Sequence, residues 1–181
     1  QKQEVLTEAK FREMYDEYRE RFKGDKEKLE ALKERLQVGM GAEAIKELQL
    51  LGYKAVVVSN QPGVARGIVT EEMLEQIHGR LGELLARKGA SLDGIYYCPY
   101  HPDGAVPQYC KDSDWRKPKP GMLLAAAQEM DIDLTKSWMI GDNERDVEAG
   151  RSAGCKTILI SAARPEYGYP EKSRPDHVAV N

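Results

Sequence analysis

The sequence predicts an α/β fold, a three-layer domain built around a parallel sheet, and two observations carry that prediction. From residue 41 onward, short apolar segments of strand length alternate with amphipathic segments of helix length, which is the pattern of βαβ units. The first 40 residues differ, because their apolar residues recur at helical spacing within a highly charged stretch. We therefore expect a helical hairpin over residues 1–40 and a core domain over residues 41–181.

The hairpin is predicted from residues 7–22, where Phe11, Tyr15 and Tyr18 fall on one helical face. Gly24 ends this helix and Asp25 can cap the second one. We expect an amphipathic appendage or cap that packs on the main domain. The alternative is an element that covers the substrate or joins two copies of the chain.

The core is predicted to begin with a helix over residues 42–51 that Gly52 ends. A second helix is expected to start at the cap Thr70, with Ile77 on its apolar face. A third is expected from Pro120, which suits a first helical turn, to residue 130. A fourth is expected over residues 144–153. The short apolar segments predicted as strands are 55–58, 94–98, 137–140, 156–161 and 177–180.

Composition narrows the possible functions. The chain has 181 residues, 41% of them apolar and 31% charged, as in an ordinary soluble domain. A formal charge of -3 gives no basic field for nucleic acid or an anionic membrane. The longest apolar run cannot span a bilayer, and the N-terminus does not read as a signal peptide. Three cysteines (Cys98, Cys110 and Cys155) favour a reducing cytoplasm.

Polar side chains follow the predicted strands at their carboxyl ends, where open parallel sheets bind ligands. Ser59 and Asn60 follow one strand, and Asp142 follows another. Arg116 and Lys117 precede a helix N-terminus. Each piece alone could be a turn, a solvated linker or a helix cap. Together they suit a phosphate held with a divalent cation, since the lysine offsets phosphoryl charge and the carboxylate binds metal.

In this order, the segments resemble the haloacid dehalogenase (HAD) superfamily of phosphatases. The closest branch is the group of D-glycero-D-manno-heptose bisphosphate and histidinol-phosphate phosphatases. The resemblance covers about residues 41–161 and implies a Rossmann-like HAD domain. The segments that carry it are Ser59-Asn-Gln-Pro-Gly-Val-Ala-Arg-Gly67, Tyr97-Cys-Pro-Tyr-His-Pro102, Arg116-Lys-Pro-Lys-Pro-Gly-Met122 and Gly141-Asp142-x-x-x-Asp146.

The resemblance implies a magnesium-dependent, cytoplasmic phosphatase of small phosphorylated sugars that works through an aspartyl-phosphate. It implies that Asp142 ligates Mg²⁺, and we expect Asp146 to act as a capping or supporting group. The implied catalytic residues are Ser59, Lys117 and Asp142. The implied substrate-binding residues are Ser59, Asn60, Gln61, Arg116, Lys117 and Asn143.

One departure from the family concerns the nucleophile. Members of the family begin with an apolar strand ending in Asp-x-Asp-Gly-Thr, and nothing before Gly41 has that pattern. In the family this strand lies between those ending at Ser59 and Asp142, so its absence would leave unpaired backbone groups. Either upstream residues are missing or another segment fills the slot. We favour a truncated phosphatase that is inactive as it stands.

A second departure concerns structural zinc. Relatives bind it through Cys-x-His and a later Cys-x-Cys, whereas here Tyr100 replaces the histidine, and Ser113 and Trp115 replace the later cysteines. We therefore expect no structural zinc, and expect loop packing through Tyr100 and Trp115 instead. The soft ligands that remain, at other spacing, are Cys98, His101 and Cys110. Cys155 is predicted to be a core residue.

Two other functions compete with the phosphatase. One is a non-catalytic protein that binds a phosphorylated metabolite or acts as a scaffold, having lost its nucleophile. The other is a phosphatase of nucleic-acid ends, which the absence of a basic patch near the motifs disfavours. No nucleic-acid or membrane partner is expected, and the N-terminal helices could mediate oligomer formation.

Overall fold

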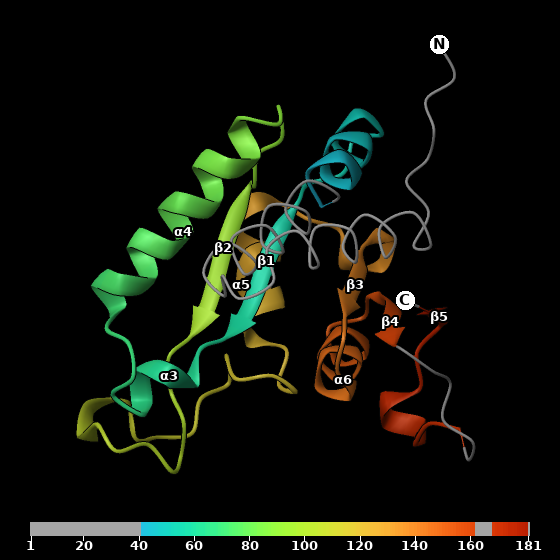
Figure 1. Cartoon of the computed structure of the whole chain (residues 1–181). Helices are drawn as coiled ribbons and strands as arrows, with labels where there is room; N and C mark the ends of the chain where they lie inside the picture. Colours follow the sequence, from blue (N-terminus) through green and yellow to red (C-terminus); the bar gives the residue numbers. More distant parts are fainter. Residues whose placement is uncertain (1–40, 162–167, 181) are drawn as a thin grey trace, which may run out of the picture. The chain divides into compact units, whose positions relative to one another are not determined.

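The computed structural model describes residues 41–161 and 168–180, so the predicted hairpin lies outside the described residues (Figure 1). The chain divides into two compact units, Gln1–Tyr53 with Gly82–Ser91, and Lys54–Leu81 with Leu92–Asn181. A domain boundary at residue 41 stays a prediction. Among the described helices, none has the length and apolar character needed to cross a membrane.

In the first unit, the predicted helix is present over residues 41–50. Gly52 follows with φ +85°, a left-handed conformation that glycine adopts without strain, so its predicted role as a stop is confirmed. The amide of Gln49 donates to the carbonyl and hydroxyl oxygens of Ser91 at 3.2 and 3.3 Å. Leu85 and Ala90 are buried.

The described residues of the second unit form five strands, all paired in parallel. Strand β1 (Val56–Asn60) pairs with β2 (Gly94–Cys98), with Ser59 opposite Tyr97. A separate sheet has the order β3-β4-β5. Its strands are β3 (Trp138–Gly141), β4 (Lys156–Ser161) and β5 (His177–Val180). The predicted strands are thus confirmed, with bounds that move by at most two residues.

The edges of β1 and β3 that face away from β2 and β4 have no strand partner among residues 41–161 and 168–180 (Figure 1). The sequence predicts a missing strand at this place. Within the described part of the chain, no other segment fills the slot.

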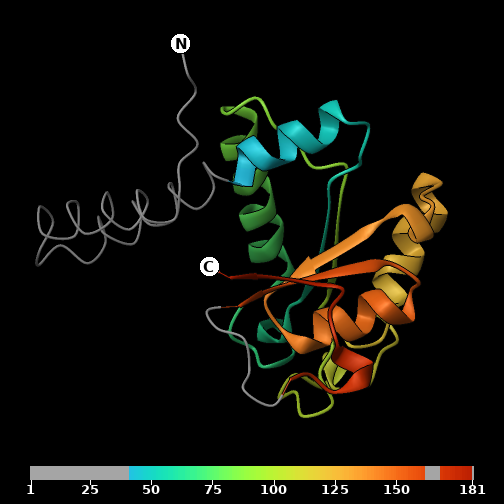
Figure 2. The ribbon, with the colours of Figure 1, turned by 90° about the vertical axis from the view of Figure 1, so that its right-hand side faces the viewer.

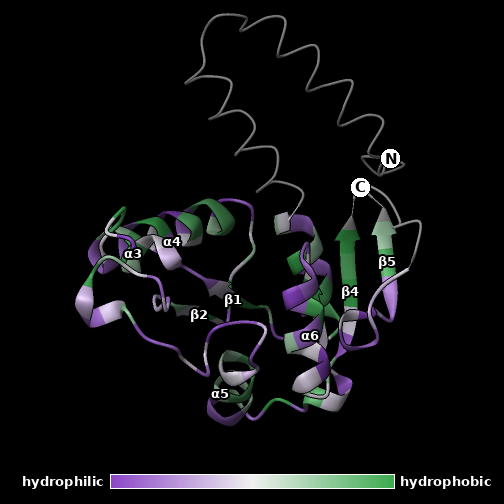
Figure 3. Cartoon of the chain, turned by 90° about the horizontal axis from the view of Figure 1, so that it is seen from below, coloured by the Kyte–Doolittle hydropathy of each residue, from purple (hydrophilic) through white to green (hydrophobic). Residues whose placement is uncertain are grey.

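Helix α6 (Glu144–Ser152) covers one face of β3 and β4, as the rotated view in Figure 2 shows. The contact is close, because a Cβ on Gly150 would lie 2.6 Å from Cβ of Met139 and 2.9 Å from Cγ2 of Thr157. Figure 3 shows β4, which α6 covers, as mostly hydrophobic. Val147, Met139 and Leu159 are buried in this layer. Glycine at position 150 therefore lets α6 approach the strands that hold part of the site.

Helix α5 (Gly121–Met130) begins after Pro120, as predicted, and packs against β1 and β2. Its buried side chains include Met122 and Ala126. The α5 N-terminus follows directly on the turn that carries Arg116 and Lys117, so packing of α5 holds that turn at the carboxyl end of β1.

Helix α4 (Glu71–Ala86) starts at the predicted cap, because the hydroxyl of Thr70 accepts a hydrogen bond from Met73 N at 3.2 Å. Leu74 is buried, whereas Ile77 is 54% exposed. At 100° per residue, Ile77 lies about 60° around the helix from Leu74, at the margin of the apolar stripe.

Short elements that no pattern in the sequence predicts complete the described part of the unit. Each spans only three or four residues, too few for a periodic pattern to be recognised. They are α3 (Pro62–Ala65), η1 (Pro107–Tyr109), η2 (Leu134–Lys136) and η3 (Glu171–Ser173).

Candidate active site

Lys117 is the central cation at the carboxyl ends of the strands. Its Nζ lies 2.7 Å from Oδ1 of Asp146 and donates to the carbonyl oxygen of Val58 at 2.8 Å. The two charged side chains are only 11% and 8% exposed. The ammonium therefore links β1 to α6, two elements that no described strand connects.

Asn60 fixes the main chain of Lys117. The side-chain amide of Asn60 donates to the Lys117 carbonyl at 3.0 Å and accepts from the Lys117 N–H at 2.9 Å. Two hydrogen bonds between one amide and one residue act like a strand pairing and satisfy both backbone groups. The end of β1 and the turn before α5 are thus joined 57 residues apart in sequence.

Asp146 stands in the first turn of α6 and serves two partners. Its Oδ2 accepts from the backbone N–H of Asn143 at 3.2 Å, and Oδ1 faces Lys117. Asn143 in turn accepts from the N–H of Arg145 at 3.3 Å, so the helix begins with a capping box. The capping role predicted for Asp146 is confirmed. The ion pair with Lys117 was missed, since residues 29 positions apart give no local signal.

Gly141 allows Asp146 to reach this position. A Cβ built on Gly141 would lie 2.5 Å from Oδ2 of Asp146 and 2.6 Å from its Cγ. Real atoms do not approach so closely, so any larger residue would displace the carboxylate. The Gly-Asp motif at the end of β3 is therefore required sterically as well as chemically.

Ser59 and Gln61 lie at the end of β1 beside Asn60. Gln61 Nε2 donates to the Ser59 hydroxyl at 3.1 Å. The backbone N–H of Gln61 donates to the Cys98 carbonyl at 2.8 Å, which ends the pairing of β1 with β2. Three polar side chains that the resemblance assigns to substrate binding thus lie together at one strand end.

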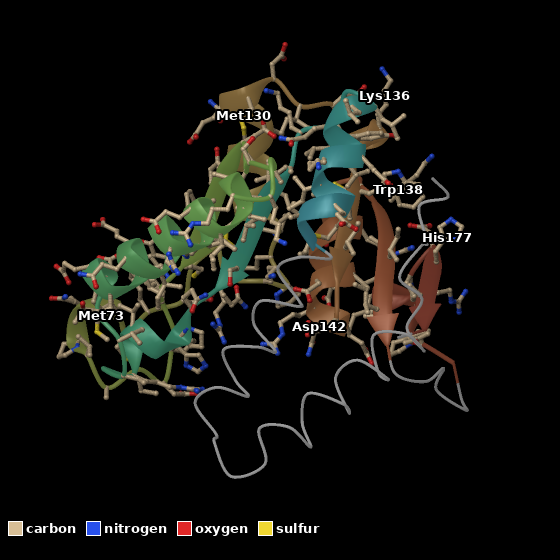
Figure 4. All side chains as sticks on the ribbon, turned by 45° about the horizontal axis from the view of Figure 1, so that its top comes forward. Met73, Met130, Lys136, Trp138, Asp142 and His177 are labelled. Atoms are coloured by element: carbon tan, nitrogen blue, oxygen red, sulfur yellow. The ribbon has the colours of Figure 1, made fainter. Side chains whose placement is uncertain are left out.

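Asp142 differs from its neighbour at position 146. Figure 4 labels it at the carboxyl end of β3, and its side chain is exposed. In the part of the chain that the structure describes, it makes no hydrogen bond or ion pair. An unengaged carboxylate is the oxygen ligand that Mg²⁺ prefers, whereas Asp146 is already bound by Lys117. Asp142 therefore fits a magnesium ligand.

A metal held by Asp142 would need further ligands. No cluster of three or more His, Cys, Asp or Glu side chains that could bind a metal occurs among residues 41–161 and 168–180. Magnesium commonly completes its shell with water and with phosphate oxygens of a substrate. Among the described residues, Asp142 is therefore a single candidate ligand for such a centre.

Arg116 lies next to Lys117 but faces other partners. Its Nη1 donates to the carbonyl of Tyr100 at 3.4 Å, and its N–H donates to the Ser113 carbonyl at 3.1 Å. Because a guanidinium carries five N–H donors, most of its donor capacity is not used by these contacts. The residue belongs to the end of a long loop over residues 99–116.

The aromatic packing expected in the 99–116 loop is present. The ring of Tyr100 lies 6.1 Å from that of Tyr109, and Lys111 Nζ lies 4.1 Å from the Tyr100 ring centroid. The ring of Trp115 lies 6.0 Å from that of Tyr96. Tyr100 and Trp115 therefore pack against different partners and do not form one cluster.

The soft ligands of this loop make separate contacts. Cys98 Sγ donates to the Tyr100 carbonyl at 3.9 Å, and Cys110 Sγ donates to the Pro102 carbonyl at 2.9 Å. His101 Nδ1 accepts from the N–H of Asp103 at 3.0 Å. The expectation that no structural zinc binds here stays a prediction.

The third cysteine lies away from the loop. Cys155 is 8% exposed, and burial raises the pKa of its thiol. It is therefore the core residue that the sequence predicts.

The comparisons with known proteins agree with this geometry. A family model described as HAD-hydrolase-like matches residues 114–181. The D-glycero-beta-D-manno-heptose-1,7-bisphosphate 7-phosphatase of Photorhabdus laumondii is 48% identical over 124 residues, 68% of this chain and 66% of that protein. The enzyme of that name from Haemophilus influenzae is 43% identical over 130 residues, 71% of this chain and 70% of that protein. This chain belongs to the HAD-like hydrolase family.

Two solved structures share the HAD-like fold. A Mesorhizobium loti protein described as a HAD-like phosphatase has a TM-score of 0.68 and 31% identity, covering 78% of this chain and 66% of that one. The D,D-heptose 1.7-bisphosphate phosphatase of B. bronchiseptica, complexed with magnesium and phosphate, has a TM-score of 0.63 and 33% identity, covering 76% and 74%. The predicted family and fold class are confirmed. The chain spans about two thirds of the length of the curated relatives it matches.

Proposed function

We propose that the intact protein is a magnesium-dependent phosphatase of small sugar phosphates, with a heptose bisphosphate as the model substrate. The observation that carries this proposal is the ammonium of Lys117, which is held at the strand ends by Asp146 and by the carbonyl of Val58. Relatives over 40% identical bear the name of a heptose bisphosphate phosphatase.

Lys117 would offset charge on the transferred phosphoryl group. Its ammonium is held by Asp146 and by a strand carbonyl, so it needs little reorganisation when a phosphate arrives. Preorganised charge of this kind is what stabilises a transition state most. Asn60 keeps the main chain of Lys117 in place while its neighbours Ser59 and Gln61 offer a hydroxyl and an amide to phosphate oxygens.

Magnesium, bound through Asp142, would supply positive charge next to the phosphoryl oxygens. The exposed, unengaged state of the Asp142 side chain supports this role. Asn143 follows it directly and caps α6 with its side chain, so we propose that it contributes to substrate binding beside the metal ligand. Arg116, with unused donors, would contact a second phosphate or a sugar oxygen.

The nucleophile would come from a strand that the described residues do not contain. The unpaired edges of β1 and β3 support a strand at that place. We propose that its aspartate attacks phosphorus and displaces the sugar hydroxyl to give an aspartyl-phosphate, which water then hydrolyses to inorganic phosphate and the free aspartate. The chain as given would then bind phosphate esters without turning them over.

A binding or scaffolding protein is the second candidate, since two separate sheets also suit a fold that no longer carries out catalysis. Two proteins separate the candidates: the chain alone, and the chain preceded by a family-type strand ending in Asp-x-Asp-Gly-Thr. If the protein is a phosphatase, both proteins should bind a sugar bisphosphate, and only the one with the added strand should release phosphate in the presence of magnesium. Binding without release in both would favour the scaffold. Turnover by the chain alone would overturn the role given to the missing strand.

A cytoplasmic location, an oligomer formed through residues 1–40 and the absence of nucleic-acid and membrane partners stay predictions.

A further inference from the structure

A carboxylate outside the proposed phosphate site joins three segments of the second unit. Glu71, in the first turn of α4, accepts from the hydroxyl of Tyr97 at 3.2 Å and from that of Tyr109 at 2.6 Å. Tyr97 is on β2 and Tyr109 is in η1 of the 99–116 loop. Each carboxylate oxygen therefore has its own tyrosine, and both tyrosine bonds are partly buried.

Hydrogen bonds to an ionised partner are about twice as strong as neutral ones. Glu71, as a hydrogen-bond acceptor, raises the pKa of Tyr109, while burial and then the charge of Glu71 raise the pKa of Tyr97. Both hydroxyls therefore keep their protons at neutral pH and remain donors to the same carboxylate.

The contacts continue from Tyr109 to Arg116. The carbonyl of Tyr109 accepts from the N–H of His101 at 3.1 Å, and its ring packs on that of Tyr100. The carbonyl of Tyr100 then accepts from Nη1 of Arg116 at 3.4 Å. Two contacts of Tyr109 thus set the position of the carbonyl that orients the guanidinium.

The middle of the loop is anchored separately, on α3. The N–H of Val106 donates to the Ala65 carbonyl of α3 at 2.9 Å. Gly104 lies against the same residue, since a Cβ there would be 2.9 Å from Cβ of Ala65. This anchor holds the middle of the loop, whereas the Glu71 contacts hold the strand and the η1 turn.

We propose that Glu71 is a positioning residue for substrate recognition: with Tyr97 and Tyr109 it forms a clasp that fixes the 99–116 loop and so aims Arg116 at the second phosphate of a sugar bisphosphate. The proposal rests on the proposed function of Arg116. It assigns the order of this loop to a carboxylate and two phenols of this chain, in addition to the packing of Tyr100 and Trp115.

The first test is independent of any ligand. Backbone amide exchange is measured by NMR in the whole chain for Tyr109→Phe and for the control Tyr96→Phe. Tyr96 is the adjacent β2 residue, and its hydroxyl donates to Glu129 at 2.6 Å, outside the loop. Tyr109→Phe should speed exchange at His101 and Gly104 at least about tenfold and shift the Arg116 Nε resonance, whereas Tyr96→Phe should do neither. Unchanged exchange and an unchanged Arg116 signal in Tyr109→Phe would overturn the clasp.

The second test measures calorimetric affinity for glucose 1,6-bisphosphate and glucose 6-phosphate in the presence of magnesium. Tyr109→Phe should weaken bisphosphate binding at least about fivefold and monophosphate binding less than about twofold. In an Arg116→Ala background, Tyr109→Phe should have no further effect, since coupled residues are not additive. A bisphosphate loss that persists in that background would show that Tyr109 does not act through Arg116.

The two tests separate the inference from the function on which it rests. If the unmodified chain binds neither phosphate ester, the proposed function fails, and with it the role of the clasp in recognition. The exchange data then decide by themselves whether Glu71 and its tyrosines hold the loop. Glu71→Gln and Tyr97→Phe provide further variants, and both should raise loop exchange in the direction of Tyr109→Phe.

Discussion

Lys117 and Asp146 form an ion pair at 2.7 Å with both side chains nearly buried. Each is further satisfied, the lysine by the carbonyl of Val58 and the aspartate by the N–H of Asn143. When the other hydrogen-bonding groups of a buried ion pair are satisfied, the pair itself destabilises the folded state little. Removing one partner destabilises it strongly, because the other charge is then buried without a partner. This pair joins β1, the turn before α5, and α6 at the proposed phosphate site.

Removal of one member should therefore destabilise the protein. We expect Asp146→Ala to lower the free energy of unfolding by about 3 kcal/mol, measured by urea denaturation. Asp142→Ala is the matched control, since Asp142 is exposed and unpaired among the described residues, and it should change stability by less than about 0.5 kcal/mol. Equal effects of the two substitutions would contradict a structural role for the pair.

Asp142 should matter more than Asp146 for magnesium binding, the reverse of their order for stability. Asp142→Asn should weaken magnesium binding, measured by calorimetry with inorganic phosphate present, far more than Asp146→Asn, because only Asp142 offers an unengaged carboxylate. If both substitutions weakened binding equally, Asp142 would not be the principal protein ligand.

Arg116 and Lys117 should affect different kinetic constants once a family-type first strand is restored. Lys117→Ala should lower kcat, because its charge acts on the transferred phosphoryl group. Arg116→Ala should mainly raise KM or change the preference between sugar monophosphates and bisphosphates. A change of less than about tenfold for both variants, roughly 1.4 kcal/mol, would show that the phosphate site lies elsewhere.

Gly141 should be intolerant of a side chain. Gly141→Ala would place a Cβ 2.6 Å from Cγ of Asp146, so the carboxylate must move away from Lys117, and we expect a loss of about 2 kcal/mol in thermal or urea unfolding. The control is Gly79→Ala in α4, where nothing lies within 4 Å of the added Cβ, and where alanine should stabilise the helix by about 0.5–1 kcal/mol. A neutral Gly141→Ala would mean that β3 can shift to accommodate it.

Asp176 should make stability depend on acid pH. Hydrogen bonds from the hydroxyl of Thr157 and then from its backbone N–H lower the pKa of Asp176 below 3.8. The stabilisation is therefore present above the unfolded pKa near 3.8 and is lost as pH falls through the lower folded value. Asp176→Asn should reduce the dependence of the free energy of unfolding on pH below about pH 4. An unchanged slope in that variant would rule out a contribution from Asp176.

Local signals in the sequence predicted most of the elements correctly. Apolar runs gave β2, β4 and β5 with the bounds that the structure has, and helix signals such as Gly52, Thr70 and Pro120 placed the helix ends to within one or two residues. These features depend on residues only a few positions apart, so they can be recognised directly in the sequence. The exposure of Ile77 and the turn of α3 were not predicted, since they depend on how far tertiary packing extends around each segment.

The candidate site was likewise predictable in part. The chemical types at the strand ends, with Ser59, Lys117 and Asp142 in order, could be read from the sequence because motif residues lie next to strand and helix signals. Their pairings could not, since partners of Lys117 lie 57 residues before it and 29 residues after it, and Glu71 meets Tyr109 across 38 residues. Contacts of that separation form only when the chain packs. The sequence by itself therefore determined the fold class and the polar residues that follow the strands, whereas the tertiary structure decided that Asn60 and Asp146 hold Lys117 and that Tyr97 and Tyr109 meet at Glu71.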